Sequence, residues 1–335
     1  MNKVISRIPE VRNELFGFSI ISIIIFHFCE NAETANSSAV LSVFVKGYDL
    51  LIGSAGVEIF LFLSGMGLFY SFSRDPHVMR FYRKRLARIL PTYLLFGGAG
   101  WLALDVVIRQ AGWGRFAWDL SMLSFWTEGV RLVWYIALIL ALYLLFPLLY
   151  RLIDASDVFA VALIAAVCAG CVALYYGAPT VYRHIEIALW RVVMFLIGVW
   201  YGKRQRQGRR FVKEWLVFAA LGAVFLLLHL LSKYQRGLLW GVVSLRLGKL
   251  FYPMIIILLA AAVLLRLKEG RLRRVLRFFG AMSLELYLSH VILRRIMNTL
   301  GFSTSFLPYY LLCIAVSFLL SLAVHKLLTR TPKRS

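Results

Sequence analysis

The sequence predicts an all-α, polytopic transmembrane helix bundle with both termini in the cytoplasm. Hydrophobic residues make up 61% of the 335 positions and charged residues only 16%, whereas soluble domains are typically about 45–50% apolar and about 25% charged. Apolar runs of about 20 residues recur along the whole chain, and each is long enough to cross a hydrocarbon core of roughly 30 Å. The runs are continuous rather than alternating, which argues against the period-two pattern of a β-barrel.

About ten apolar segments are expected to cross the membrane. They lie near 14–30, 55–73, 89–108, 131–151, 157–176, 187–202, 214–231, 249–266, 278–297 and 307–328. The stretch 118–126 (WDLSMLSFW) is too short to cross and is expected at the membrane interface. No low-complexity linker divides the chain, so residues 1–335 are interpreted as a single membrane domain.

The distribution of Lys and Arg predicts the orientation. With the N-terminus placed inside, 26 of the 38 Lys and Arg fall in inner segments, 11 fall in outer segments, and Arg191 lies within a span. Cytoplasmic loops carry such an excess, and the net charge of +22 follows from it. Because the basic residues are spread over many short loops, the lipid bilayer is an expected partner and nucleic acid is not.

Three ionisable residues, His27, Glu58 and His290, lie inside predicted spans. A charge there is costly and is by default a functional hypothesis. The helical rise of 1.5 Å places His27 roughly 21 Å, Glu58 roughly 24 Å and His290 roughly 18 Å above the inner surface. All three therefore fall in one slab in the outer half of the membrane, where they are expected to line a shared cavity.

Other polar residues are expected on the same helix faces. They are Ser283, Tyr287 and Arg294 with His290, and Arg12, Ser19 and Glu30 with His27. Such stripes face the bundle interior or a water-filled cavity. Two alternatives stay open for them: hydrogen bonding that only joins helices, and three-ligand zinc binding by the two histidines and Glu58. His229, His184 and His325 lie near helix ends and are expected to be structural or interfacial.

The residue types indicate a reaction class. A histidine whose pKa is near neutrality is suited to remove a proton from an incoming hydroxyl. A nearby carboxylate holds the histidine in the required tautomer and stabilises the imidazolium that forms. This combination favours acyl or phosphoryl transfer to an alcohol, with His27 as the base and Glu58 or Glu30 assisting it.

A basic cluster follows the second predicted span. It contains Arg80, Arg83, Lys84, Arg85 and Arg88. Arginine forks suit phosphate oxygens, so the cluster predicts a cytoplasmic mouth at which a phosphate-bearing donor docks. The alternative is that these residues only set topology and bind anionic lipid headgroups.

Four segments resemble the integral-membrane acyltransferase-3 family. The segment GVEIFLFLSGMGL resembles its G-V-D/E-x-F-F-x-L-S-G signature, and FYRKRLARILPTYLL resembles its F-x-x-R-R-x-x-R-I-x-P-x-Y segment. The segment VWYIALILALYLLFPLL resembles its W-Y/F…Y-L-x-x-P segment, and SLELYLSHVIL resembles its S-x-x-x-Y-L-x-H segment. Their order and spacing together cover nearly the full length of the chain.

The resemblance implies O-acylation, most often O-acetylation, of sugars in bacterial envelope glycans or glycolipids, by an enzyme of the inner membrane. It implies a cytoplasmic acyl-CoA as donor substrate, with no permanently bound cofactor and no metal. By position, His27, Glu58 and His290 take the catalytic places, and Arg83, Arg85 and Arg88, with Arg12, take the donor-binding places. The residues expected to bind substrate are Glu30, Tyr287, Ser283, Arg294 and Trp134.

The chain departs from the family pattern at two places. The family often has an arginine eleven positions before the first histidine, where this chain has Phe16, and Arg12 one turn earlier is a candidate substitute. The segment WYIALILALY lacks the acid that many members carry. Two rival functions therefore stay open: a transporter or flippase that uses its ionisable groups for proton coupling, and a catalytically inactive scaffold.

Overall fold

The computed structural model describes residues 1–33, 39–53, 55–234 and 241–330, and these residues form helices and no strands. The first half contains α1 (Asn2–Ile5), η1 (Ile8–Val11), α2 (Arg12–Glu33), α3 (Ala39–Leu51), α4 (Ala55–Arg74), α5 (Val78–Tyr93), η2 (Leu94–Gly98), α6 (Ala99–Trp101), η3 (Leu102–Ile108), α7 (Gly112–Leu120), α8 (Leu123–Glu128) and α9 (Trp134–Ala155). The second half contains α10 (Asp157–Gly177), α11 (Pro179–Leu189), α12 (Val192–Arg206), α13 (Val212–Tyr234), α14 (Gly241–Phe251), α15 (Pro253–Arg266), α16 (Arg271–Ala281), α17 (Ser283–Thr299) and α18 (Leu307–Arg330).

Within the described ranges, eight helices are long and apolar enough to span a membrane. The bent pair α16–α17 makes a ninth if it is counted as one span. The prediction of a helical membrane bundle is therefore confirmed, and the count of ten spans stays a prediction. The predicted span 214–231 falls on α13. The cytoplasmic placement of the termini stays a prediction.

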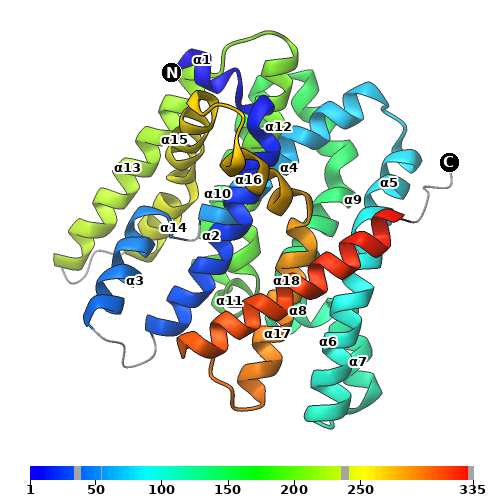
Figure 1. Cartoon of the computed structure of the whole chain (residues 1–335). Helices are drawn as coiled ribbons and strands as arrows, with labels where there is room; N and C mark the ends of the chain where they lie inside the picture. The colour runs from blue at the N-terminus through cyan, green and yellow to red at the C-terminus, as the bar shows by residue number, and fades with distance from the viewer. Residues whose placement is uncertain (34–38, 54, 235–240, 331–335) are drawn as a thin grey trace.

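Helix α2 runs through the middle of the bundle, with α13, α14 and α15 to one side of it and α5 to α9 to the other (Figure 1). It contacts α4, α16 and α17. Helix α16 crosses α2 in this view, and α17 and α18 lie beside its lower half. Residues from both ends of the sequence are therefore brought against the same central helix.

Close helix approaches fix this core. A Cβ atom at Gly198 would lie 2.1 Å from the carbonyl oxygen of Phe62, so α12 can reach α4 only because that position is glycine. A Cβ at Gly17 would lie 1.9 Å from the carbonyl oxygen of Leu276, and the same argument holds for α2 against α16. Small residues at helix contacts are the usual means of close packing in membranes.

The basic cluster at 80–88 lies on a helix rather than in a loop. Helix α5 continues through η2, α6 and η3 to give one helical segment, Val78–Ile108, of 31 residues. Arg85 and Arg88 are three residues apart on α5 and therefore share a face. The guanidinium groups of Arg85 and Arg88 are therefore carried on the same face of one continuous helix.

Helix α16 ends at a sharp bend, and α17 leaves it at an angle of 68°. Met282 separates the two helices. Helix α16 is basic and lies against α2, whereas α17 continues alongside α2 and α18 (Figure 1). The cavity described below lies next to this bend and is lined by residues of α2, α4, α5, α9, α16, α17 and α18.

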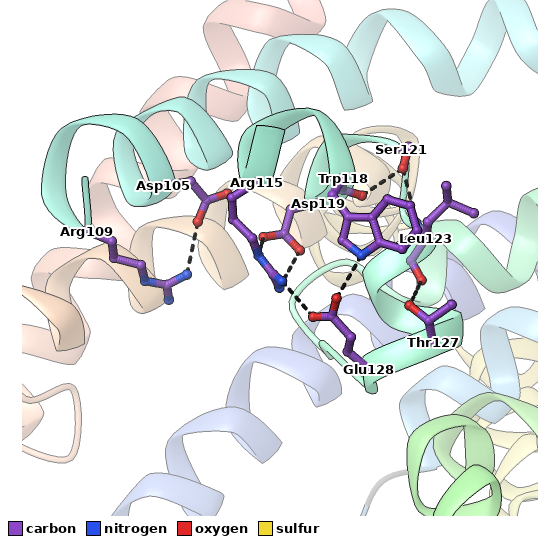
Figure 2. Close-up of polar contacts among 9 residues, drawn as sticks. All are labelled: Asp105, Arg109, Arg115, Trp118, Asp119, Ser121, Leu123, Thr127 and Glu128. Carbon is purple, nitrogen blue, oxygen red and sulfur yellow. Dashed lines mark hydrogen bonds and ion pairs between the residues drawn. The ribbon is translucent and has the colours of Figure 1, made fainter. Parts of the chain in front are cut away.

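The predicted interfacial stretch forms two short helices, α7 and α8, joined by a dense polar network (Figure 2). Arg115 donates from Nε to Asp119 Oδ2 at 2.7 Å and from Nη1 to Glu128 Oε2 at 2.7 Å. Trp118 Nε1 donates to Glu128 Oε1 at 2.8 Å. Arg109 pairs with Asp105 at 3.1 Å at the end of the preceding segment. We call these six residues the α7–α8 network.

Candidate active site

The two predicted intramembrane histidines meet. His27 on α2 and His290 on α17 are 263 positions apart in the sequence, and His27 Nδ1 lies 2.7 Å from His290 Nε2. His290 is 1% exposed. Helical rise placed both residues in the same slab of the membrane, and the contact between α2 and α17 brings their side chains together.

The hydrogen bonds around the pair define its tautomers. His290 Nδ1 lies 2.8 Å from the carbonyl oxygen of Leu286, which only accepts hydrogen bonds, so Nδ1 carries the proton. In the neutral ring, Nε2 of His290 is then an acceptor, and His27 Nδ1 donates to it. This assignment leaves the lone pair on His27 Nε2 free to act as a base.

Arg294 joins the same two helices one turn beyond the histidines. Its Nη1 donates to the carbonyl oxygen of His27 at 3.1 Å and lies 3.5 Å from Glu30 Oε2. The carboxylate of Glu30 is 55% exposed, whereas the Arg294 side chain is 19% exposed. Arg294 and Glu30, both predicted to bind substrate, therefore lie next to the histidine pair, toward the C-terminal end of α2.

Glu58 occupies a different place from the predicted one. Its Oε1 lies 2.9 Å from Nε of Arg191, and both side chains are buried. Arg191 in turn lies over the ring of Trp134, 5.0 Å from its centroid. Within the described part of the chain, the partner of Glu58 is therefore an arginine and not His27. His290 takes the supporting position that the sequence analysis gave to Glu58.

Arg191 is a residue that the sequence reasoning missed as a site candidate. A signal was present, because Arg191 falls inside the predicted span 187–202. A charge at that depth needs a partner. An acid at comparable depth on another span was its expected counter-charge, and Glu58 is that acid.

A cavity of about 480 Å³ extends below the histidine pair, within the roughly 300–1,000 Å³ usual for small-molecule sites. Along α2 it runs from Arg12 to Ile23, a distance of about 16 Å by helical rise. Ile23 is one turn before His27. Tyr287 also lines the cavity, and its ring centroid is 6.2 Å from that of His290. The far end of the cavity therefore lies beside the histidine pair.

The end of the cavity near the start of α2 is lined by Arg12, Arg85 and Arg88, which we call the cavity arginines, and by Arg277. Arg12 donates to the carbonyl oxygen of Leu63 at 3.4 Å, and Arg85 donates to Ser71 Oγ at 2.7 Å. Among the described residues, none of the three cavity arginines pairs with a carboxylate. This end of the cavity therefore presents uncompensated positive charge to a ligand.

Some of the predicted binding residues line this cavity and others do not. Ser283 lines it, as Arg12, Arg85 and Arg88 do, whereas Arg83 is exposed and does not. The helical form of the basic cluster explains this correction, because Arg83 is two residues from Arg85 and so faces away from it.

Phe16, the departure from the family pattern, also lines the cavity. The guanidinium carbon of Arg12 lies 4.7 Å from the centroid of the Phe16 ring, and that ring is 5.2 Å from the ring of Phe60. The aromatic ring therefore supports a positive charge one turn away. Arg12 lines the cavity, as it must if it substitutes for the arginine that the family often has at the position of Phe16.

His325 is a further correction. It was expected to be structural or interfacial, but it lines the cavity, and its Nδ1 lies 3.1 Å from Glu285 Oε1. Glu285 is buried and was not considered a candidate. Across the described residues, no group of three His, Cys, Asp or Glu side chains is arranged to hold a metal ion.

Comparison with known proteins identifies the family. The family model described as an acyltransferase domain matches residues 17–326, which include the histidine pair and the cavity arginines of α5. Neither a curated protein nor a solved structure matches the chain. The protein is therefore a membrane acyltransferase that transfers groups other than aminoacyl groups, and the chain belongs to the acyltransferase-3 family.

Proposed function

We propose that the protein moves an acyl group, specifically acetyl, from a cytoplasmic acyl-CoA to a sugar hydroxyl of an envelope glycan or glycolipid. The observation that carries the proposal is the hydrogen-bonded pair His27–His290 beside a cavity whose other end holds unpaired arginines. A base and an anion site about one cavity length apart suit a long donor with phosphates at one end and a thioester at the other.

In this proposal the cavity arginines bind the phosphates of coenzyme A. Arginine forks make strong, charge-assisted hydrogen bonds to phosphate oxygens. The pantetheine arm of the donor lies along α2, and the thioester lies near Tyr287 and Ile23 at the far end of the cavity. CoA is a donor substrate here and not a resident cofactor.

The chemistry follows from the tautomers. His27 Nε2 accepts the proton of the acceptor hydroxyl as its oxygen attacks the thioester carbonyl. The tetrahedral intermediate collapses with cleavage of the C–S bond, and the leaving thiolate takes the proton from His27. His290 Nε2 accepts the Nδ1 hydrogen bond of His27 and stabilises the imidazolium, the role of the third group in a triad.

Tyr287 is the proposed oxyanion donor. Its hydroxyl is buried and has no hydrogen-bond partner among the described residues. A buried unpaired hydroxyl is costly, and a developing oxyanion supplies the partner. Glu30 and Arg294 lie at the opposite side of the histidines from the cavity, where we place the acceptor sugar. Donor entry from the cytoplasm and acceptor entry from outside fit a bacterial inner membrane.

The test uses purified protein in lipid nanodiscs with radiolabelled acetyl-CoA and candidate envelope glycans. Wild-type protein is expected to transfer label to the glycan, and His27→Ala is expected to reduce kcat about 10²- to 10⁴-fold, the usual contribution of a general base. His184→Ala is the matched control, because His184 lies on α11 outside the cavity. Label transfer by His27→Ala at the wild-type rate contradicts the proposed chemistry. Transbilayer movement of unlabelled glycan without transfer supports a flippase instead.

A further inference from the structure

A histidine–acid pair, His325 and Glu285, lies at the cavity, separate from the His27–His290 pair. His325 is near the end of α18, and Glu285 is in the first turn of α17. His325 Nδ1 lies 3.1 Å from Glu285 Oε1, and the side chains are 27% and 11% exposed. His325 lines the cavity, whereas Glu285 lies behind it, away from the lining.

The pairing determines which ring atom a ligand can meet. A carboxylate only accepts hydrogen bonds, so His325 Nδ1 donates to Glu285. The second nitrogen, Nε2, is then the ring atom available to a molecule in the cavity. As a neutral ring it accepts a hydrogen bond, and as an imidazolium it donates one. An amide group, with both N–H and C=O, can pair with either form.

The position of His325 lies between the two ends of the cavity. Glu285 precedes His290 by five residues, about 7.5 Å by helical rise, toward α16. Arg12, in contrast, precedes His27 by fifteen residues, about 22 Å by helical rise. His325 therefore meets the part of a donor between the phosphates and the thioester.

A structural lock between α17 and α18 is the competing interpretation. That junction already has hydrogen bonds of its own, because Ser289 Oγ lies 2.8 Å from Ser321 Oγ and 3.2 Å from the carbonyl oxygen of Ser317. None of those three serines lines the cavity, whereas His325 does. The position of His325 in the cavity lining favours a role in binding a ligand.

We infer that His325, oriented by Glu285, binds an amide group in the pantetheine arm of the acyl donor and so selects for a pantetheine-type thioester. The inference rests on the proposed function, since it assumes that the donor occupies this cavity. His325 contributes affinity for the arm. The cavity arginines contribute affinity for the phosphates.

Three donors separate these contributions: acetyl-CoA with arm and phosphates, acetyl-pantetheine with the arm alone, and S-acetyl butanethiol with neither. The quantity measured is kcat/KM for acetyl transfer in nanodiscs. His325→Ala is expected to lower it about three- to tenfold for acetyl-CoA and for acetyl-pantetheine alike, the loss of one hydrogen bond, through KM with kcat nearly unchanged. S-acetyl butanethiol is expected to be unaffected.

Matched variants complete the design. His325→Gln places an amide near the position of Nε2 and is expected to restore part of the loss. Lys326→Ala removes a charge from the adjacent exposed position and is expected to leave all three donors unchanged. Arg85→Met is expected to impair acetyl-CoA but not acetyl-pantetheine.

The outcomes are distinct. An equal loss with all three donors in His325→Ala indicates a structural role and overturns the inference. A loss confined to acetyl-CoA also overturns it, because the contact is then to phosphate, and so does no loss at all. If the wild-type protein uses none of the three donors, the proposed function itself fails, and the inference fails with it.

Discussion

Arginines occupy two kinds of environment in this protein, the α7–α8 network and the cavity. In the network, Arg115 contacts both Asp119 and Glu128, and Arg109 contacts Asp105 (Figure 2). Each guanidinium there has a carboxylate partner. Of the cavity arginines, Arg12 and Arg85 have a backbone carbonyl, a serine hydroxyl or aromatic rings as neighbours. None of the three pairs with a carboxylate within the described residues.

The difference indicates which positive charges belong to the fold and which belong to a ligand. A buried or half-buried cation without a counter-charge is costly. Arg12 and Arg85 are two such half-buried cations at one cavity, with the exposed Arg88 beside them, and a stable fold accommodates them if an anion binds there. Arg191, paired with buried Glu58, resembles the network and not the cavity. A charged residue in a membrane helix therefore indicates a ligand site less clearly than a charged residue that has no counter-charge.

The largest effect is expected from breaking the α7–α8 network. Asp119 is fully buried, and Arg115 contacts both of its carboxylate oxygens. Arg115→Leu leaves that carboxylate uncompensated, which typically costs about 3–5 kcal/mol. Because the Arg115 side chain is 33% exposed, we expect the lower limit, about 3 kcal/mol, in the free energy of unfolding measured by denaturation in mixed micelles.

The double variant Arg115→Leu with Asp119→Asn is the control for this prediction. Removing both charges is expected to recover most of the lost free energy, because the neutral amide does not require a cation. The acetyl-transfer rate per folded molecule is expected to stay at the wild-type value in both variants. Unchanged stability in the single variant contradicts the idea that paired arginines support the fold.

An intermediate effect is expected at the cavity. Arg85→Met removes one proposed phosphate contact, and hydrogen bonds to charged groups contribute about 1.5–3 kcal/mol each. We therefore expect the KM for acetyl-CoA to rise about ten- to hundredfold, since each 1.4 kcal/mol is tenfold. The free energy of unfolding is expected to stay the same or to increase, because an unpaired cation is removed.

Arg83→Met is the matched control, because Arg83 is on the same helix but is exposed and does not line the cavity. Its effect on KM is expected to be less than twofold. If Arg83→Met and Arg85→Met raise KM equally, the basic cluster acts as a diffuse charge at the membrane surface. The distinction between lining and non-lining arginines then fails.

Much of the fold was predictable because membrane insertion requires long apolar segments, which are visible in one dimension. The continuity of the spans was less predictable, because α16 bends away from α17 by 68° within the predicted span 278–297. The α5 helix begins eleven residues before the predicted span because basic residues are good helix formers as well as loop residues.

The site was predictable where depth alone sufficed. His27 and His290 meet because helical rise places them at one level. Depth does not define azimuth, so Glu58 at the same level pairs with Arg191 on another side of α4. The position of His325 in the cavity depends on how α18 crosses α17, which no local pattern in the sequence specifies.

The smallest effect is expected at the exposed edge of the α7–α8 network, where pH provides the test. The hydrogen bond from Arg115, with a further one from Trp118, lowers the pKa of Glu128 below its usual value. A lowered pKa in the folded state means that the ionised carboxylate contributes stability above the unfolded-state pKa of about 4.3. That contribution is lost as the pH falls through the lower folded-state pKa.

Glu128→Gln is therefore expected to reduce the free energy of unfolding by less than about 1 kcal/mol at pH 7, since the side chain is 42% exposed and solvent screens the pair. The difference from wild type is expected to shrink once the pH falls below the unfolded-state pKa of about 4.3, and to vanish below the lower folded-state pKa of Glu128. Unfolding measurements at pH 7, 5 and 3.5 check both statements. A difference that stays constant across this range means that Glu128 acts through its shape and not its charge. In that case the buried Asp119 alone accounts for the electrostatic stabilisation of the network. A carboxylate then stabilises an arginine in this membrane protein only when the carboxylate is buried.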